Sequence, residues 1–110
     1  MKAFVKQVQH LNHGGYGNGY VVLPPEHPYH GRDYEEIPVP VHGGLTFAES
    51  ADNLNWEELD EGDKGGWVIG FDTKHMRDNL DNWPKESVLK ETAELKDKLE
   101  QAWQLKKTRV

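Results

Sequence analysis

Residues 84–106 read PKESVLKETAELKDKLEQAWQLK, and this stretch decides the fold. A mostly apolar stripe recurs through it at spacings of three and four residues, at Val88, Thr92, Leu95, Leu99 and Ala102 with Trp103. Such spacing places the stripe on one face of an α-helix. Pro84 suits the first helical position, where a missing N–H group breaks no hydrogen bond. We therefore predict a long amphipathic helix over residues 84–106.

Two continuous apolar runs precede this helix. They are Tyr20–Leu23 (YVVL) and Trp67–Phe71 (WVIGF), and runs of this length are typical of buried β-strands. A third β-prone segment, around Phe4, Val5 and Val8, opens the chain. The intervening segment from His13 to Gly19 holds four glycines, which indicates either a mobile turn or a backbone that must come close to another group.

Residues 37–41 (IPVPV) alternate apolar side chains with proline. This period of two predicts a strand, and the prolines place it at an edge of the sheet because they cannot donate ladder bonds. Gly43 and Gly44 then form the predicted loop of a hairpin whose second strand is residues 45–48. The predicted class is α+β, with a small antiparallel sheet and the C-terminal helix packed on it.

Length and composition narrow the possible classes of protein. The 110 residues suffice for one domain, 1–110, with the sheet and loops in 1–82. The chain has no cysteine, no signal-like apolar start and no run long enough to cross a membrane, so we expect a cytoplasmic protein. The net charge of −6 disfavours long nucleic acid as a partner. Motifs for P-loops, zinc proteases and nucleophilic serine are absent from the sequence.

Three polar clusters carry the candidate chemistry. The first, residues 27–34 (HPYHGRDY), combines imidazole, guanidinium and phenol groups on a predicted loop. The second, residues 41–47 (VHGGLTF), places His42 beside a glycine pair whose backbone amides suit an anion. The alternatives are a surface loop pinned by prolines and a plain hairpin turn.

The third cluster, residues 70–79 (GFDTKHMRDN), follows a predicted buried strand. Asp72, His75 and Asp78 lie at three-residue steps and share a face if the segment turns helically. With His42, these groups could bind a divalent metal or act as a base and its orienting group. Asp72 could equally cap the turn by accepting backbone hydrogen bonds.

The same motifs resemble a family of small uncharacterised proteins of bacteriophages and prophages. The resemblance covers roughly residues 19–100 and rests on His27, Pro28, Gly31, Asp33, Tyr34, Val39, Val41, His42, Gly43, Gly44, Leu45, Thr46, Trp67, Gly70, Phe71, Asp72, His75 and Asp78. It implies a phage accessory protein in the cytoplasm of a bacterial host, and it assigns no active site. Accessory proteins of this size often act against host defences.

Three functions follow from these observations. We favour a binding protein that sequesters a small anionic ligand, such as a cyclic or modified nucleotide of host immune signalling, without a required cofactor. Its predicted ligand-binding residues are His27, His30, Arg32, Tyr34, His42, Gly43, Gly44, Thr46, Trp67, Asp72 and His75. The alternative is a small metal-assisted hydrolase or phosphodiesterase that uses His42, Asp72, His75 and Asp78.

The third function is a protein-interaction inhibitor that blocks a host enzyme through its acidic loop, Glu57–Asp63, or through its helix, since an acidic surface can mimic nucleic acid. A homodimer is a further expectation, because a small sheet with a proline-bearing edge can build its pocket across two chains.

Overall fold

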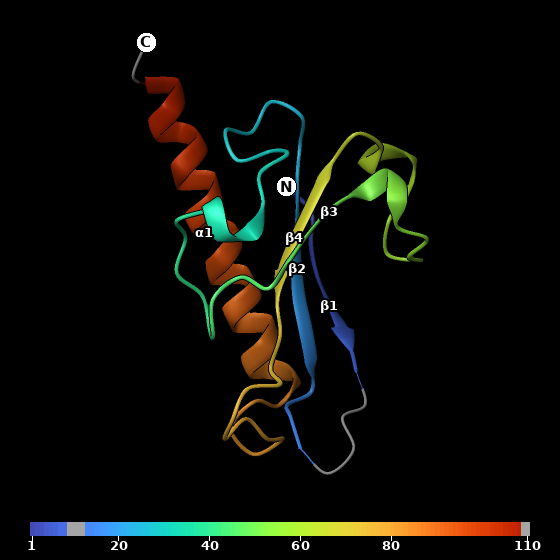
Figure 1. Ribbon diagram of the computed structural model, residues 1–110, viewed down its shortest axis with the longest axis vertical. Coiled ribbons are helices and arrows are strands. Elements are labelled where there is room, and N and C mark those ends of the chain that lie inside the picture. The colour runs from blue at the N-terminus through green and yellow to red at the C-terminus, as the bar shows by residue number, and fades with distance from the viewer. Residues whose placement is uncertain (9–12, 109–110) are drawn as a thin grey trace.

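The computed structural model describes residues 1–8 and 13–108. Its elements are, in chain order, β1 (Ala3–Gln7), β2 (Gly17–Leu23), the 3₁₀-helix η1 (Tyr34–Glu36), β3 (Phe47–Ser50), the 3₁₀-helices η2 (Ala51–Asn53) and η3 (Glu61–Asp63), β4 (Trp67–Phe71) and α1 (Lys85–Thr108). The strands pair antiparallel in the order β1-β2-β4-β3. Helix α1 lies along one face of this sheet (Figure 1). The predicted α+β class is confirmed.

The central strands β2 and β4 bury both of their faces. Val21 and Ile69 are partners in the β2–β4 register, and both are fully buried beneath α1. Val22 and Val68 are the next partners, and they face the opposite side of the sheet. Alternate side chains of a strand point to opposite faces. Continuous apolar runs are therefore required here, and the predictions for both strands are confirmed.

The predicted stripe of α1 is the face that covers the sheet. Val88, Leu95 and Leu99 are fully buried in the core under the helix, and Thr92 is almost so. The Thr92 hydroxyl donates to the Val88 carbonyl at 2.7 Å, which satisfies it inside the core. The helix begins at Lys85, directly after Pro84, whose carbonyl accepts hydrogen bonds from the next turn.

The predicted edge strand at 37–41 and its hairpin are wrong. This segment forms no strand; it crosses α1 as irregular chain, with Ile37 buried and the Pro40 carbonyl bonded to Lys98 at 2.8 Å. Two prolines remove alternate backbone donors, so the segment cannot form a regular ladder. The apolar side chains at every second position pack against the core, but the backbone of the segment pairs with no strand. The edge strand beside β4 is instead β3, which starts at Phe47.

Strand β2 begins three residues earlier than expected, within the glycine-rich segment. Gly17 pairs with Gln7 of β1, and a side chain at 17 would overlap the Lys6 carbonyl. A side chain at Gly19 would overlap the Phe71 ring and the Thr92 hydroxyl of α1. These glycines permit close packing in a strand, which supports the alternative of a close backbone approach over that of a mobile turn. Within the described ranges, no helix combines the length and apolar character needed to cross a membrane.

Replacing Leu95 by alanine should lower the free energy of unfolding by about 2–5 kcal/mol, because it leaves a cavity under α1. Leu89→Ala is the matched control, since Leu89 is on the same helix but 45% exposed. Its effect should stay near 0.5 kcal/mol, as for most surface substitutions. Urea unfolding measures both values. Equal losses in the two variants would contradict the assignment of the buried face.

Candidate functional site

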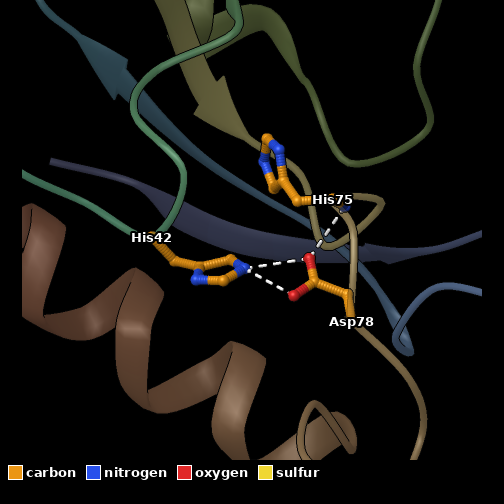
Figure 2. Close-up of side chains that lie close together, drawn as sticks. All are labelled: His42, His75 and Asp78. Atoms are coloured by element: carbon orange, nitrogen blue, oxygen red, sulfur yellow. Dashed lines mark hydrogen bonds and ion pairs between the residues drawn. The ribbon is translucent and has the colours of Figure 1, made fainter.

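His42, His75 and Asp78 meet beyond the end of β4. One possible ligand atom of each lies within 4.8 Å of the others. The Nε2 atom of His42 is 2.9 Å and 3.1 Å from the two carboxylate oxygens of Asp78, and the backbone N–H of His75 donates to the same carboxylate at 2.9 Å (Figure 2). The structure thus brings together three residues predicted from two distant segments. We call this group the His–His–Asp cluster.

The loop from residue 72 to residue 83 fixes the position of Asp78. The Asp78 backbone N–H donates to the His75 carbonyl at 2.9 Å, and its carbonyl accepts from Gly14 at 3.1 Å. At the base of the loop, Trp83 donates from its backbone to Asn79 at 2.8 Å. The Asp78 side chain is only 5% exposed. Its carboxylate is therefore held in place by burial and by hydrogen bonds from the His42 ring and the His75 backbone N–H.

Helix α1 and Trp83 hold His42. The backbone N–H of His42 donates to the Glu91 carboxylate of α1 at 2.6 Å, and its ring packs on the indole of Trp83 with centroids 4.0 Å apart. The His42 side chain remains 23% exposed and that of His75 35% exposed. The cluster is therefore supported from within the protein and still reachable from solvent.

Gly43 has a packing role that the sequence interpretation missed. Its φ is +68°, and a side chain there would overlap the Nε2 atom of His75. Gly43 lies in a turn that is closed by a hydrogen bond from the Gly44 N–H to the Val41 carbonyl at 2.9 Å. The predicted turn is therefore present, but it does not join two paired strands. Glycine tolerates this backbone conformation and allows the close approach of the imidazole. Gly43 thus lets His42 and His75 share one site.

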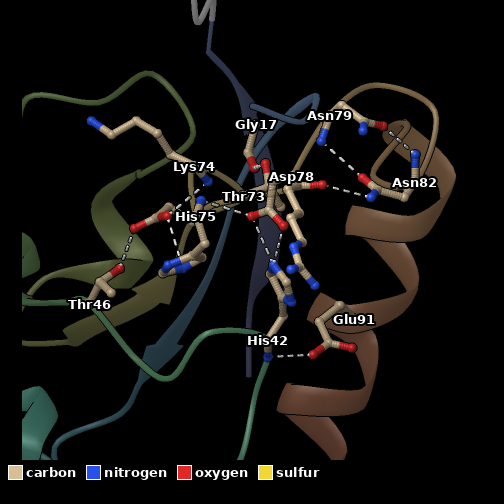
Figure 3. A network of polar contacts seen from close by, with 12 residues as sticks. Gly17, His42, Thr46, Thr73, Lys74, His75, Asp78, Asn79, Asn82 and Glu91 are labelled. Atoms are coloured by element: carbon tan, nitrogen blue, oxygen red, sulfur yellow. Dashed lines mark hydrogen bonds and ion pairs between the residues drawn. The ribbon is translucent and has the colours of Figure 1, made fainter. Parts of the chain in front are cut away.

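Asp72 lies beside the cluster, and both of its carboxylate oxygens accept hydrogen bonds. One oxygen accepts from the Thr46 hydroxyl at 2.9 Å, and the other accepts from the backbone N–H of Lys74 at 3.0 Å (Figure 3 labels both donor residues). The second oxygen is also 3.2 Å from the Nε2 atom of His75. The bond from Lys74 supports the alternative in which Asp72 caps its turn. The carboxylate does not belong to the group of three possible ligands.

The first polar cluster, residues 27–34, lies away from the His–His–Asp cluster, and its residues hold neighbouring segments of the chain together. It borders the start of β4, whereas the His–His–Asp cluster follows the end of that strand. His27 is buried between the Leu99 carbonyl, at 2.9 Å, and the backbone N–H of Tyr29, at 3.0 Å. The ring of His30 bonds to the Gly65 carbonyl at 2.7 Å. Ring nitrogens of both histidines are hydrogen bonded to backbone groups. This supports the alternative of a surface loop pinned by prolines.

The remaining predicted ligand residues divide between bracing contacts and the surface. The Trp67 indole donates to the Arg32 carbonyl at 2.8 Å, and Tyr34 begins η1, which Asp33 caps. The Arg32 side chain is exposed and, with Tyr29 and Lys106, borders a shallow groove of about 280 Å³. A volume of this size is at the lower limit for small-molecule pockets. A single pocket containing all the predicted ligand residues is not formed.

The acidic segment proposed to mimic nucleic acid is partly neutralised within the chain. Lys2 lies 2.6 Å from the Asp63 carboxylate and 3.3 Å from that of Asp60, and Lys6 lies 2.9 Å from that of Glu58. These pairs tie the segment to β1 and reduce the charge that it presents. They weaken the case for an inhibitor that acts through acidic mimicry. The predicted homodimer stays a prediction.

The donor types and spacing of the His–His–Asp cluster suit a divalent transition metal. Two imidazoles and a carboxylate are ligands of zinc, and with open positions they are also typical of iron(II) and related ions. Metal–ligand distances of about 2.0–2.2 Å keep ligand atoms within roughly 4.4 Å of one another. The observed separations of up to 4.8 Å need only a small side-chain adjustment.

Two supporting residues, Trp83 and Glu91, were not among the predicted site residues. Each sits in a local sequence with an ordinary structural explanation, next to Pro84 or on a polar face of the helix, so no local signal singles them out.

Comparison of the chain with protein-family models, curated proteins and solved structures gives no match. The interpretation of the site therefore rests on its geometry.

Acidification should destabilise the protein through His27. Burial lowers the pKa of His27 below its ordinary value of 6.5. The unfolded chain therefore takes up this proton first as the pH falls, and stability present above pH 6.5 is lost as the pH drops toward the folded-state pKa. His27→Gln should remove this part of the pH dependence. Urea unfolding at pH 7.5 and 5.5 tests it, and parallel profiles for the two proteins would contradict the assignment.

Proposed function

We propose that the protein binds a divalent transition metal through His42, His75 and Asp78, and that the metal holds a small anionic ligand. The observation that carries the proposal is the approach of three suitable donor groups to within 4.8 Å. The partial exposure of both imidazoles leaves a side from which a ligand can reach the metal. An anion fits there because a divalent ion outweighs the single carboxylate in its coordination shell.

The support around the donors favours a prepared site over a chance surface contact. The Asp78 carboxylate is almost buried, His42 is held by Glu91 and Trp83, and Gly43 makes room for His75. Outer contacts of this kind orient metal ligands in known sites. On this proposal the metal replaces the proton between the His42 Nε2 atom and the Asp78 carboxylate.

The proposed class of ligand rests on the sequence resemblance to small phage and prophage proteins, which is an expectation from the sequence alone. On that basis we propose a cyclic or modified nucleotide of host immune signalling, bound through its phosphate and sequestered in the cytoplasm of the bacterial host. Metal-assisted hydrolysis of such a phosphodiester is the second candidate. A metal at this cluster would supply a Lewis acid next to the phosphate, which either function can use.

Zinc or manganese should bind the protein after it has been treated with a chelator, and His42→Ala should weaken binding by more than about 100-fold, beyond the usual effect of outer-shell changes. Isothermal titration calorimetry measures both. His30→Ala is the matched control, because the His30 ring bonds to a backbone carbonyl at the other end of β4, away from the cluster. Circular dichroism confirms that each variant folds. Equal affinities in the two variants would refute the assignment.

Sequestration and hydrolysis differ in what becomes of the nucleotide. Purified protein is mixed with cyclic and ADP-ribose-derived nucleotides, with and without Zn²⁺ or Mn²⁺, and the nucleotides are separated before and after heat denaturation. Intact nucleotide that disappears and returns on heating indicates sequestration. New products indicate hydrolysis. A panel that stays unchanged with metal present would contradict the proposed ligand class.

A further inference from the structure

The Asp72 carboxylate joins β3 to the loop that carries His75 and Asp78. The Thr46 hydroxyl, next to β3, donates to one of its oxygens, and the backbone N–H of Lys74 donates to the other. The second oxygen lies 3.2 Å from the Nε2 atom of His75. Two donors from separate segments therefore fix the carboxylate that faces this imidazole. The side chain is 27% exposed, so its position depends on these bonds more than on burial.

The Nε2 atom of His75 is the second observation. It is buried, and within the described part of the chain no partner meets it in hydrogen-bond geometry. It also packs directly over Gly43, where any side chain would overlap it. The His75 side chain as a whole is 35% exposed, so this exposure comes from other atoms of the side chain. A buried polar nitrogen without a partner is costly and needs an explanation.

We propose that Asp72 is the positioning residue of the metal site. Its carboxylate accepts the Nε2–H of His75, and the ring then presents the lone pair of Nδ1 to the metal. A neutral imidazole carries one proton, so fixing that proton on Nε2 leaves Nδ1 as the acceptor. This inference rests on the proposed metal binding and specifies how His75 takes part in it.

The Nε2 atom of His75 already lies close to the Asp72 carboxylate. The 3.2 Å separation is within reach of a hydrogen bond, and only the alignment is lacking. Polar contacts at functional sites are often poorly aligned before the ligand binds. A metal on the Nδ1 side would orient the ring and bring the Nε2–H into line with Asp72. Histidine ligands in metal sites commonly donate their other ring N–H to a carboxylate in this way.

The test uses Asp72→Asn, Thr46→Val and a matched control, Asp81→Asn. Asp81 is an exposed acid on the same loop, so its loss changes the local charge equally. Zn²⁺ affinity is measured by calorimetry on chelator-treated protein at one fixed pH, with thermal melting as a check on folding. We expect Asp72→Asn to weaken binding by about 10–100-fold, in the range of outer-shell carboxylates. Thr46→Val should weaken it in the same direction by less, and Asp81→Asn should leave it unchanged.

A spectroscopic measurement separates positioning from general destabilisation. In ¹⁵N-histidine NMR spectra, the zinc-bound protein should show His75 coordinated through Nδ1 and protonated at Nε2, and Asp72→Asn should reduce the population of that tautomer. Coordination through Nε2 would overturn the inference, and so would unchanged affinity in Asp72→Asn. A loss equal to that of His42→Ala would make Asp72 a ligand and would also overturn it. If the unmodified protein binds no metal, the proposed function itself fails.

Discussion

The pairing of β2 with β4 is the constraint on which the rest of the structure depends. Its register sets Gly19 opposite Phe71, so that α1 approaches the sheet closely where Thr92 packs on Gly19. Just after β4, the buried Thr73 hydroxyl donates to the Gly17 carbonyl of β2 at 2.7 Å. The loop that carries His75 and Asp78 therefore leaves the sheet at a fixed point. A shift by one residue would turn every side chain of a strand to the other face.

The helix and the two central strands could be predicted because their patterns reflect burial directly. WVIGF at 67–71 is a strand with the predicted boundaries, and the stripe from Val88 to Leu99 is the buried face of α1. The segment at 37–41 shows where this reasoning fails. Its period of two is caused by contact with the core, and periodicity cannot distinguish a paired strand from an extended chain packed on a helix. Likewise, glycines that permit close strand packing have the same composition as a mobile turn.

The candidate site was partly predictable for a different reason. Histidine and aspartate at three-residue steps after a buried strand indicated His75 and Asp78, and His42 stood out beside the glycine pair. The chemistry of single residue types cannot tell a ligand from a brace, however. His27 and His30 have the same side chain as His42, but one ring nitrogen of each is bonded to a backbone carbonyl. Which imidazole stays available is decided by tertiary contacts, and those contacts involve residues distant in sequence, such as Glu91.

The position of the cluster also bears on how the chain is held together. His42 lies on the irregular segment that crosses α1, whereas His75 and Asp78 lie on the loop after β4. An ion bound by all three would act as a cross-link between segments more than thirty residues apart, in a chain that has no disulfide. Closing a loop of this length removes conformational entropy from the unfolded chain. Binding free energy at such a site is also folding free energy, so metal supply would set the lifetime of the folded protein as well as its occupancy.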